Sequence, residues 1–250
     1  MGSWEALRRE FDNWGEAGRK ASLWWRDDDA AEDTPALRRL LSIAGTAEAS
    51  VALAVVPARL SESLRSLLRH PDSAFAVPVQ HGYAHENHAP AGEKKSEFPA
   101  GRDRAAVRDE IASGLARAKE LPRFVPAFVP PWNRGLDTIR PVLRDLGFAG
   151  VSTFGPRETT GAKPIQVNTH VDIVDWRGGR GFVGMEPALD RLIGHLRDRR
   201  AGRADADEPT GILSHHLVHD DGCWAFLEEL FRQTRHAAAR WLGAGEVFGS

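Results

Sequence analysis

Short apolar runs alternate with amphipathic stretches along most of this chain. The runs have the length of buried strands, whereas the stretches between them place apolar side chains at three- and four-residue spacing, which is typical of helices. The predicted strands are residues 22–26, 51–56, 74–80, 124–129, 149–153, 164–168 and 211–214. The predicted helices are residues 3–18, 35–44, 60–69, 103–120, 136–146, 186–199 and 224–241. Strands that alternate with helices in this order indicate an α/β fold with a mainly parallel sheet.

Side chains able to carry chemistry come directly after several of the predicted strands. Asp28, His81, Trp132 and His215 each follow an apolar run. The carboxyl ends of the strands in a parallel barrel share one face, and barrel enzymes carry out their reactions there. We therefore expect these four side chains to lie close together.

Composition and charge exclude several classes of function. The 33 basic and 35 acidic residues leave a formal charge of −2, so neither nucleic acid nor an anionic membrane surface is an expected partner. The single cysteine, Cys223, rules out an internal disulfide. No apolar run is long enough for a membrane span, and the charged N-terminus lacks the apolar core of a signal peptide. We expect a cytoplasmic protein.

No internal repeat and no convincing linker interrupts the chain. A chain of 250 residues is long enough for one sizeable α/β domain. We therefore expect a single domain over residues 1–250, in which residues 1–20 contribute an N-terminal surface helix.

Two histidines and a run of three acids are the candidate metal ligands. His81 and His85 lie four residues apart, and Asp27, Asp28 and Asp29 follow the first predicted strand. Two imidazoles and one carboxylate form the ligand set of a catalytic zinc site that keeps a position open for water. The alternatives are a chance histidine spacing and a solvated acidic turn at a helix N-terminus.

Other motifs follow later strands. Pro131 lies in a proline pair, which stiffens the backbone before Trp132 and would present the Trp132 N–H to a developing oxyanion; a simple turn is the alternative. Trp176 would stack on the apolar face of a sugar, and Asp172 would hold a catalytic histidine protonated; a strand with a core tryptophan is the alternative. Further candidates are His88, as a rim or substrate residue, and His215 or His216, as a general acid.

The ordered series of acids, paired histidines, Pro-Pro-aromatic, Asp-x-x-x-Trp and Leu-x-His resembles the polysaccharide deacetylase (NodB-homology) family of metal-dependent carbohydrate esterases. The resemblance runs from about residue 24 to residue 215. It implies a distorted (β/α) barrel, usually seven-stranded, and the removal of N- or O-acetyl groups from sugars. It also implies a divalent metal cofactor, with zinc the first choice and cobalt, nickel or manganese as alternatives.

The resemblance implies a role for each matching residue. Asp29, His81 and His85 match the metal ligands. Asp28 matches the base, Trp132 the oxyanion donor, His215 the acid and Asp172 its charge partner. The list of implied substrate contacts is Trp176, Pro131 and His88. A register in which Asp27 is the base and Asp28 the ligand stays open.

Two departures indicate a divergent branch. The arginine that often precedes Pro-Pro and orients the base is Val129 here, so Arg26 or Arg134 would have to substitute for it. The glycine that usually follows the acid pair is Ala30. Two rival functions therefore stay open: hydrolysis of another C–N bond, such as a cyclic amide or ureide, and non-catalytic carbohydrate binding.

Overall fold

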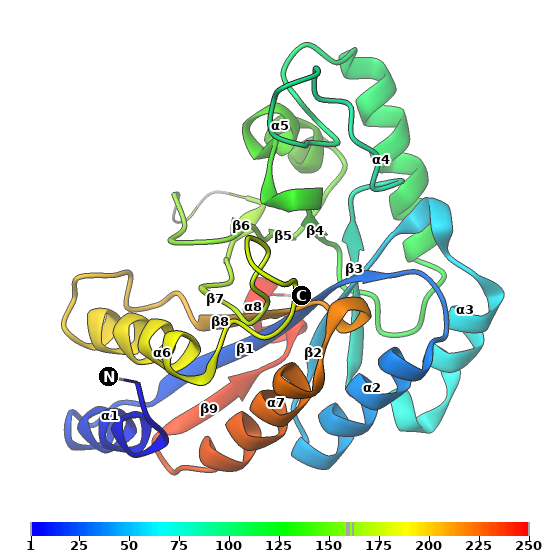
Figure 1. Ribbon diagram of the computed structural model, residues 1–250. Helices are drawn as coiled ribbons and strands as arrows, with labels where there is room; N and C mark the ends of the chain where they lie inside the picture. The colour runs from blue at the N-terminus through cyan, green and yellow to red at the C-terminus, as the bar shows by residue number, and fades with distance from the viewer. Residues whose placement is uncertain (1, 159–160, 162, 250) are drawn as a thin grey trace.

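In the computed structural model, which describes residues 2–158, 161 and 163–249, a curled parallel sheet is flanked by helices (Figure 1). Hydrogen bonds join the strands in the order β6-β5-β4-β3-β2-β1-β8-β7, and β9 pairs with β1. The strands are β1 Ala21–Ala30, β2 Val51–Val55, β3 Ala76–His81, β4 Ala127–Val129, β5 Gly150–Val151, β6 Ile165–Gln166, β7 Val171–Asp172, β8 Thr210–Ser214 and β9 Ala239–Leu242. The α-helices are α1 Trp4–Glu16, α2 Pro35–Ala47, α3 Glu62–Arg69, α4 Arg104–Ala118, α5 Leu136–Asp145, α6 Met185–Arg200, α7 Asp221–Gln233 and α8 Ala244–Phe248.

The sheet closes into a distorted barrel because one segment contacts both of its ends. The segment that contains β6 and β7 pairs first with β5 and then with β8. Between the two strands, Thr169 N donates to Thr153 O at 3.1 Å and His170 N donates to Gly211 O at 2.7 Å. If β6 and β7 are counted as one strand and β9 is left out, seven strands form the barrel in the part of the chain that the structure describes. This number agrees with the family resemblance.

Side-chain size along β1 and β2 separates the barrel interior from the helix layer. Successive side chains of a strand point to opposite faces. Ala52, Ala54 and Trp24 pack in the interior, whereas Leu53 and Trp25 pack in the large core beneath the helices. Small residues at the inward positions of β2 leave room inside the barrel, and this room accommodates polar side chains near the strand ends.

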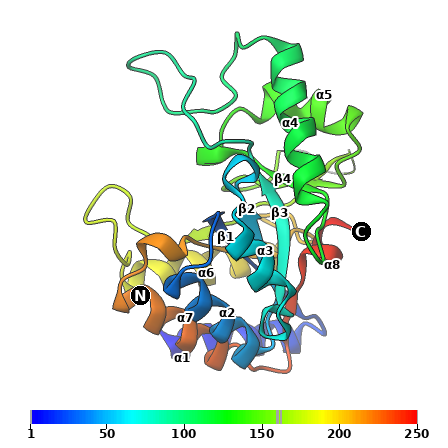
Figure 2. The same ribbon diagram turned by 90° about the vertical axis from the view of Figure 1, so that its right-hand side faces the viewer.

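The helices cover two separate cores. The apolar faces of α1, α2, α6 and α7 pack with β1 and β2, and those of α4 and α5 pack with Phe98 and Phe128 (Figure 2). The predicted start of α2 is confirmed, because Thr34 caps it by accepting from Leu37 N at 3.0 Å. Among the described residues, no helix is both long and apolar enough to cross a membrane.

The prediction of one helix over residues 224–241 is wrong. The helix α7 ends at Gln233, and residues 239–242 form β9, which pairs with the start of β1. Tertiary packing overrides the helix propensity of this stretch: Trp241 lies against Phe231 with ring centroids 4.8 Å apart. The short helix α8 follows and places Phe248 against Trp24, at 5.8 Å between ring centroids.

Candidate active site

The end of β1 distributes three adjacent acids among different environments. By strand alternation, Asp28 lies on the inward face with Arg26, and Asp27 points toward the helix layer. The pairing of β1 with β2 becomes irregular between Asp27 and Ala30, and Asp29 has a left-handed backbone with φ of 75°. This irregularity breaks the alternation, so that Asp29 approaches His81, the last residue of β3, and His85 in the turn that follows it.

Asp29, His81 and His85 form what we call the metal-ligand group. The Oδ1 atom of Asp29 lies 3.2 Å from Nε2 of His81 and 3.2 Å from Nε2 of His85. Each of the three residues offers one ligand atom, and these three atoms all lie within 4.8 Å of one another. The Nδ1 atom of His81 lies 2.9 Å from Val129 O, to which it donates in the tautomer that leaves Nε2 free for a cation.

The pKa shifts of these residues follow from burial and mutual charge. Burial tends to raise the pKa of Asp29, but His81, His215 and His85 lower it below the ordinary value. Burial tends to lower the pKa of His81, yet the Asp28 and Asp29 carboxylates raise it. The pKa of His85 is lowered by burial and by neighbouring His81.

Asp28 is a buried carboxylate held by Arg26. The guanidinium Nη2 donates to Asp28 Oδ2 at 3.0 Å, and Nε lies 2.9 Å from Oδ1. Arg26 is fully buried and also donates to Ser152 Oγ at 2.7 Å and to Asn133 Oδ1 at 2.7 Å. Of the two arginines named as substitutes for the one absent at Val129, Arg26 is therefore the one that pairs with Asp28.

Arg134, the other candidate substitute for the missing arginine, does not pair with Asp28 among the described contacts. Its side chain is exposed and Nη1 donates to Lys95 O at 3.0 Å.

His215 follows β8 and faces Asp28 from the opposite side of the site. Its Nε2 atom lies 3.8 Å from Asp28 Oδ2, and its buried Nδ1 has no hydrogen-bond partner among the described residues. The Trp176 ring meets the His215 ring edge-on, at 4.7 Å between centroids. Trp176 Nε1 donates to Asp172 Oδ2 at 2.8 Å, so Asp172 holds the indole beside the histidine. Burial raises the pKa of Asp172, although the charge of His215 acts to lower it.

Asp27, the alternative candidate for the base, and His216, the alternative candidate for the acid, contact each other. His216 Nδ1 forms a very short contact with Asp27 Oδ1, and Ser214 Oγ and His216 N donate to Asp27 Oδ2 at 2.6 and 3.0 Å. Burial acts to raise the pKa of Asp27, but His216 lowers it below its ordinary value. The Asp27 carboxylate thus ties the turn that carries His215 to the end of β1.

The Pro-Pro-aromatic turn lies beside the histidines. Trp132 has a left-handed backbone, with φ of 55°, and its ring centroid lies 4.4 Å from that of His85. Pro131 is buried and packs against Gly82 in the histidine loop. His88 is exposed on the next loop, outside the metal-ligand group, and its N–H donates to Ser96 O at 2.9 Å.

Glu97 contacts the histidine loop of the site, although no sequence motif marks it as a site residue. It belongs to the segment interpreted as a loop over residues 88–101, yet it is buried and accepts hydrogen bonds from three backbone N–H groups of the histidine loop. Burial raises the pKa of Glu97, while these donors act to lower it. Nothing in the local pattern marks the contact, because it forms only when the loop folds back on itself.

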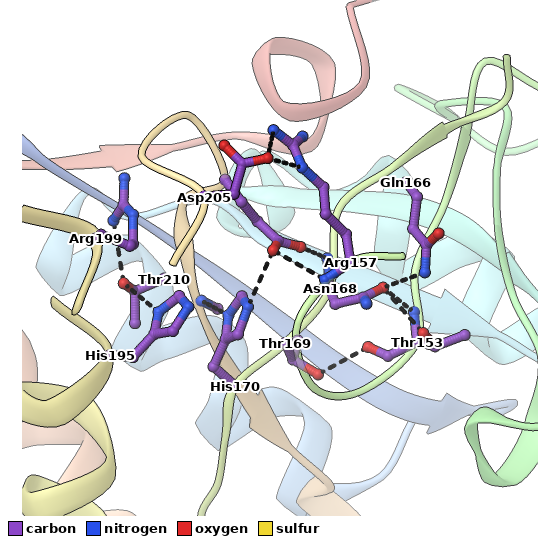
Figure 3. A network of polar contacts seen from close by, with 12 residues as sticks. Thr153, Arg157, Gln166, Asn168, Thr169, His170, His195, Arg199, Asp205 and Thr210 are labelled. Atoms are coloured by element: carbon purple, nitrogen blue, oxygen red, sulfur yellow. Dashed lines mark hydrogen bonds and ion pairs between the residues drawn. The ribbon is translucent and has the colours of Figure 1, made fainter. Parts of the chain in front are cut away.

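A second group of histidines lies at the start of β8, where His195 and His170 contact Thr210 and Gly211 (Figure 3). The rings of His170 and His195 stack at 3.6 Å between centroids, and His170 Nε2 lies 3.4 Å from Glu208 Oε2. Gly211 N donates to His170 Nδ1 at 3.0 Å, and His195 Nδ1 lies 2.9 Å from Thr210 Oγ1. We call His170, His195 and Glu208 the buried cluster.

Comparison with known proteins identifies the fold. No family model and no curated protein matches the chain. The solved Bc1960 peptidoglycan N-acetylglucosamine deacetylase is 16% identical over 95% of this chain and 96% of that one, with a TM-score of 0.61. A Mycobacterium smegmatis protein classed as a polysaccharide deacetylase is 16% identical over 93% and 90%, with a TM-score of 0.59. The chain therefore has the fold of polysaccharide deacetylases.

The same fold also occurs in a protein described as a pseudoenzyme. A BA3943 mutant, called a CE4 family pseudoenzyme with restored enzymatic activity, is 16% identical over 92% of this chain and 68% of that chain, with a TM-score of 0.57. The fold alone therefore does not decide whether a chain is catalytic; the residues of the site do.

Proposed function

We propose that this protein is a metal-dependent hydrolase that removes acetyl groups from an N- or O-acetylated sugar or glycoconjugate. The observation that carries the proposal is the convergence of Asp29, His81 and His85 beside Asp28 and His215, in a deacetylase fold. A non-catalytic sugar-binding protein has no need of a ligand set, a held carboxylate and a second proton carrier in one place.

The metal-ligand group fits a divalent cation. Two imidazole nitrogens and one carboxylate oxygen converge, and this donor set suits zinc first, with cobalt, nickel and manganese as alternatives. A divalent ion in such a site lowers the pKa of its bound water and polarises the acyl carbonyl of a substrate.

Asp28 is the proposed general base. It lies next to the metal-ligand group, and Arg26 holds its carboxylate from the barrel interior with Nη2 and Nε. This arrangement fixes the orientation of the carboxylate, so that it accepts a proton from water attacking the acyl carbon. Such proton transfer by a positioned side chain contributes roughly 10²–10⁴-fold to the rate.

His215 is the proposed general acid, and it protonates the leaving amine or alkoxide of the sugar. Trp176 and Asp172 border His215, and about 44% of Trp176 is exposed, which leaves the indole available to stack on a sugar ring. Trp132 is the proposed oxyanion donor through its backbone N–H. Pro131 supports the turn that carries Trp132, and His88 is a candidate rim contact.

Acetate release from a panel of N- and O-acetylated sugars tests the proposal. Metal-loaded protein is expected to release acetate from at least one of them, and protein treated with a chelator is expected to release none until metal is restored. Ring opening of cyclic amides or ureides without acetate release would instead favour the rival C–N hydrolase. Binding of sugars without any product would favour the rival function, non-catalytic carbohydrate binding. A protein of the same fold is described as a pseudoenzyme. A cytoplasmic location stays a prediction.

A further inference from the structure

We propose that Glu97 is a positioning residue for the histidine loop of the metal site; this inference rests on the proposed function. Its carboxylate accepts from the N–H groups of Tyr83, Ala84 and His85 at 3.1, 2.7 and 3.0 Å. These are three consecutive residues of the turn that joins the two ligand histidines. Glu97 is 1% exposed, so water does not compete for these hydrogen bonds.

The turn needs such an acceptor because its backbone is unfavourable on its own. Both Gly82 and His85 have left-handed φ values, of 56° and 57°. A left-handed backbone is unfavourable at a non-glycine residue such as His85 and persists only where the surrounding structure enforces it. An ionised carboxylate has about four acceptor sites and no donor, so one side chain is able to bind three convergent N–H groups. Glu97 thereby offsets the cost of the conformation that turns His85 toward Asp29.

The turn lies so close to Glu97 that residue 82 has no space for a side chain. A Cβ atom added to Gly82 would lie 1.9 Å from Glu97 Oε2 and 2.6 Å from Pro131 Cγ. Residue 82 must therefore be glycine for two reasons, its left-handed φ and the absence of space. The carboxylate and the Pro-Pro turn together enclose the histidine loop.

The position of Glu97 is itself fixed by its neighbours along the chain. Arg102 Nη1 donates to Glu97 O at 3.0 Å, and Arg102 pairs with Glu110 of α4 at 2.6 Å. Phe98 is fully buried, with its ring centroid 5.9 Å from that of Phe128 in β4. Glu97 thus connects the histidine loop to α4 and to the core, and it transmits their rigidity to a metal ligand that lies beyond the end of β3.

Metal affinity of Glu97→Gln tests the inference directly. Glutamine keeps the shape but presents an amide donor to N–H groups that need acceptors. Loss of such an outer-shell partner costs about 10–100-fold in metal affinity. The Kd for Zn²⁺ is measured by competition with a chromophoric chelator, together with the visible absorption spectrum of the Co²⁺-loaded protein. Glu93→Gln, an exposed position on the same loop, is the matched control.

We expect a Zn²⁺ Kd that is about 10–100-fold higher and an altered Co²⁺ spectrum for Glu97→Gln, and wild-type values for Glu93→Gln. Wild-type uptake of metal together with an unchanged Kd and spectrum in Glu97→Gln would overturn this inference alone. Wild-type protein that takes up no metal would overturn the proposed function and this inference together.

A second measurement needs no variant, in case Glu97→Gln fails to fold. In metal-free wild-type protein, amide hydrogen exchange at Tyr83, Ala84 and His85 is expected to be slower than at the exposed loop residues Lys94 and Lys95. Exchange at equal rates would show that the carboxylate does not hold the turn, and would overturn the inference.

Discussion

The metal-ligand group and the buried cluster contain the same residue types, two histidines and one carboxylate, but they differ in how those side chains are satisfied. In the buried cluster the Nδ1 atoms of both rings have partners on β8, and Glu208 accepts from Asn168 N at 2.8 Å and Arg157 N at 3.1 Å. His170 Nε2 lies 3.4 Å from Glu208 Oε2 without a hydrogen bond, and the His195 ring does not share that carboxylate among the described contacts. In the metal-ligand group the two Nε2 atoms converge on a single carboxylate oxygen instead.

Backbone conformation separates the two groups as well. Asp29 and His85 have left-handed backbones, whereas none of the three residues of the buried cluster does. Strain of this kind persists only where surrounding structure enforces it, and it is concentrated at functional sites. The convergence of two imidazole nitrogens on one carboxylate oxygen, carried by a strained backbone, therefore distinguishes the candidate metal site from the buried cluster, whereas residue type does not.

Substitution of one histidine in each group should give the largest difference between the two groups, measured as bound zinc. His81→Ala removes a proposed ligand, so we expect loss of stoichiometric zinc, a greater effect than the roughly 10–100-fold that loss of an outer-shell partner costs. His170→Asn is expected to retain zinc. Metal content after dialysis measures both, and zinc retained by His81→Ala but lost from His170→Asn would reverse the assignment.

Asp28→Asn should separate chemistry from metal binding. We expect the turnover number to fall by about 10²–10⁴-fold, because the amide does not accept the proton of the attacking water. Metal content should stay at the wild-type level, since Asp28 lies outside the metal-ligand group. Acetate release under saturating substrate checks the rate, and full activity with bound metal would remove Asp28 as the base.

Arg26→Met should destabilise the fold as well as the site. Asp28 would be left buried without its cation, which costs about 3–5 kcal/mol in the free energy of unfolding. The double variant Arg26→Met/Asp28→Asn should recover part of this loss, because the orphaned charge is removed. Urea denaturation measures the cycle, with Arg134→Met on the surface as the control. A loss below about 1 kcal/mol in Arg26→Met would show that the buried pair is not needed.

The smallest expected effect is on the pH dependence of stability. Burial, followed by the charges of His170 and Arg199, lowers the pKa of His195 to about 3. The unfolded chain therefore binds a proton below about pH 6.5 that the folded protein does not bind, and stability falls from there toward about pH 3. His195→Gln should reduce the loss of unfolding free energy between pH 7 and pH 4 by on the order of 1–3 kcal/mol. Urea denaturation at these pH values checks it, and an identical slope in wild type and variant would contradict it.

Much of the architecture follows from sequence pattern, because strand and helix periodicity are local properties. The parallel sheet and the capped start of α2 are predicted in this way, whereas the seven-stranded barrel is implied only by the family resemblance. The strand β9 is not predicted, because residues 239–241 continue the helical pattern of residues 224–241, and only the folded chain brings the start of β1 alongside to pair with them.

The site divides in the same manner. The candidate ligands lie at the carboxyl ends of strands or just beyond them and are visible as motifs, whereas the partners that hold them are not. From the sequence, Arg26 is only one of two possible substitutes for the missing arginine. Its contacts to Ser152 and Asn133 are not predictable from the sequence, because they form only in the closed barrel. The pairing of Asp27 with His216 joins residues that are far apart in the chain, and the sequence offered each of them separately as a catalytic candidate.

Anomalous diffraction at the zinc edge from crystals of zinc-loaded protein tests the central claim most directly. We expect a peak about 2.0–2.2 Å from Nε2 of His81, Nε2 of His85 and a carboxylate oxygen of Asp29. Absence of a peak between these three residues in protein that binds zinc stoichiometrically, or a peak at His170 and Glu208 instead, would contradict it.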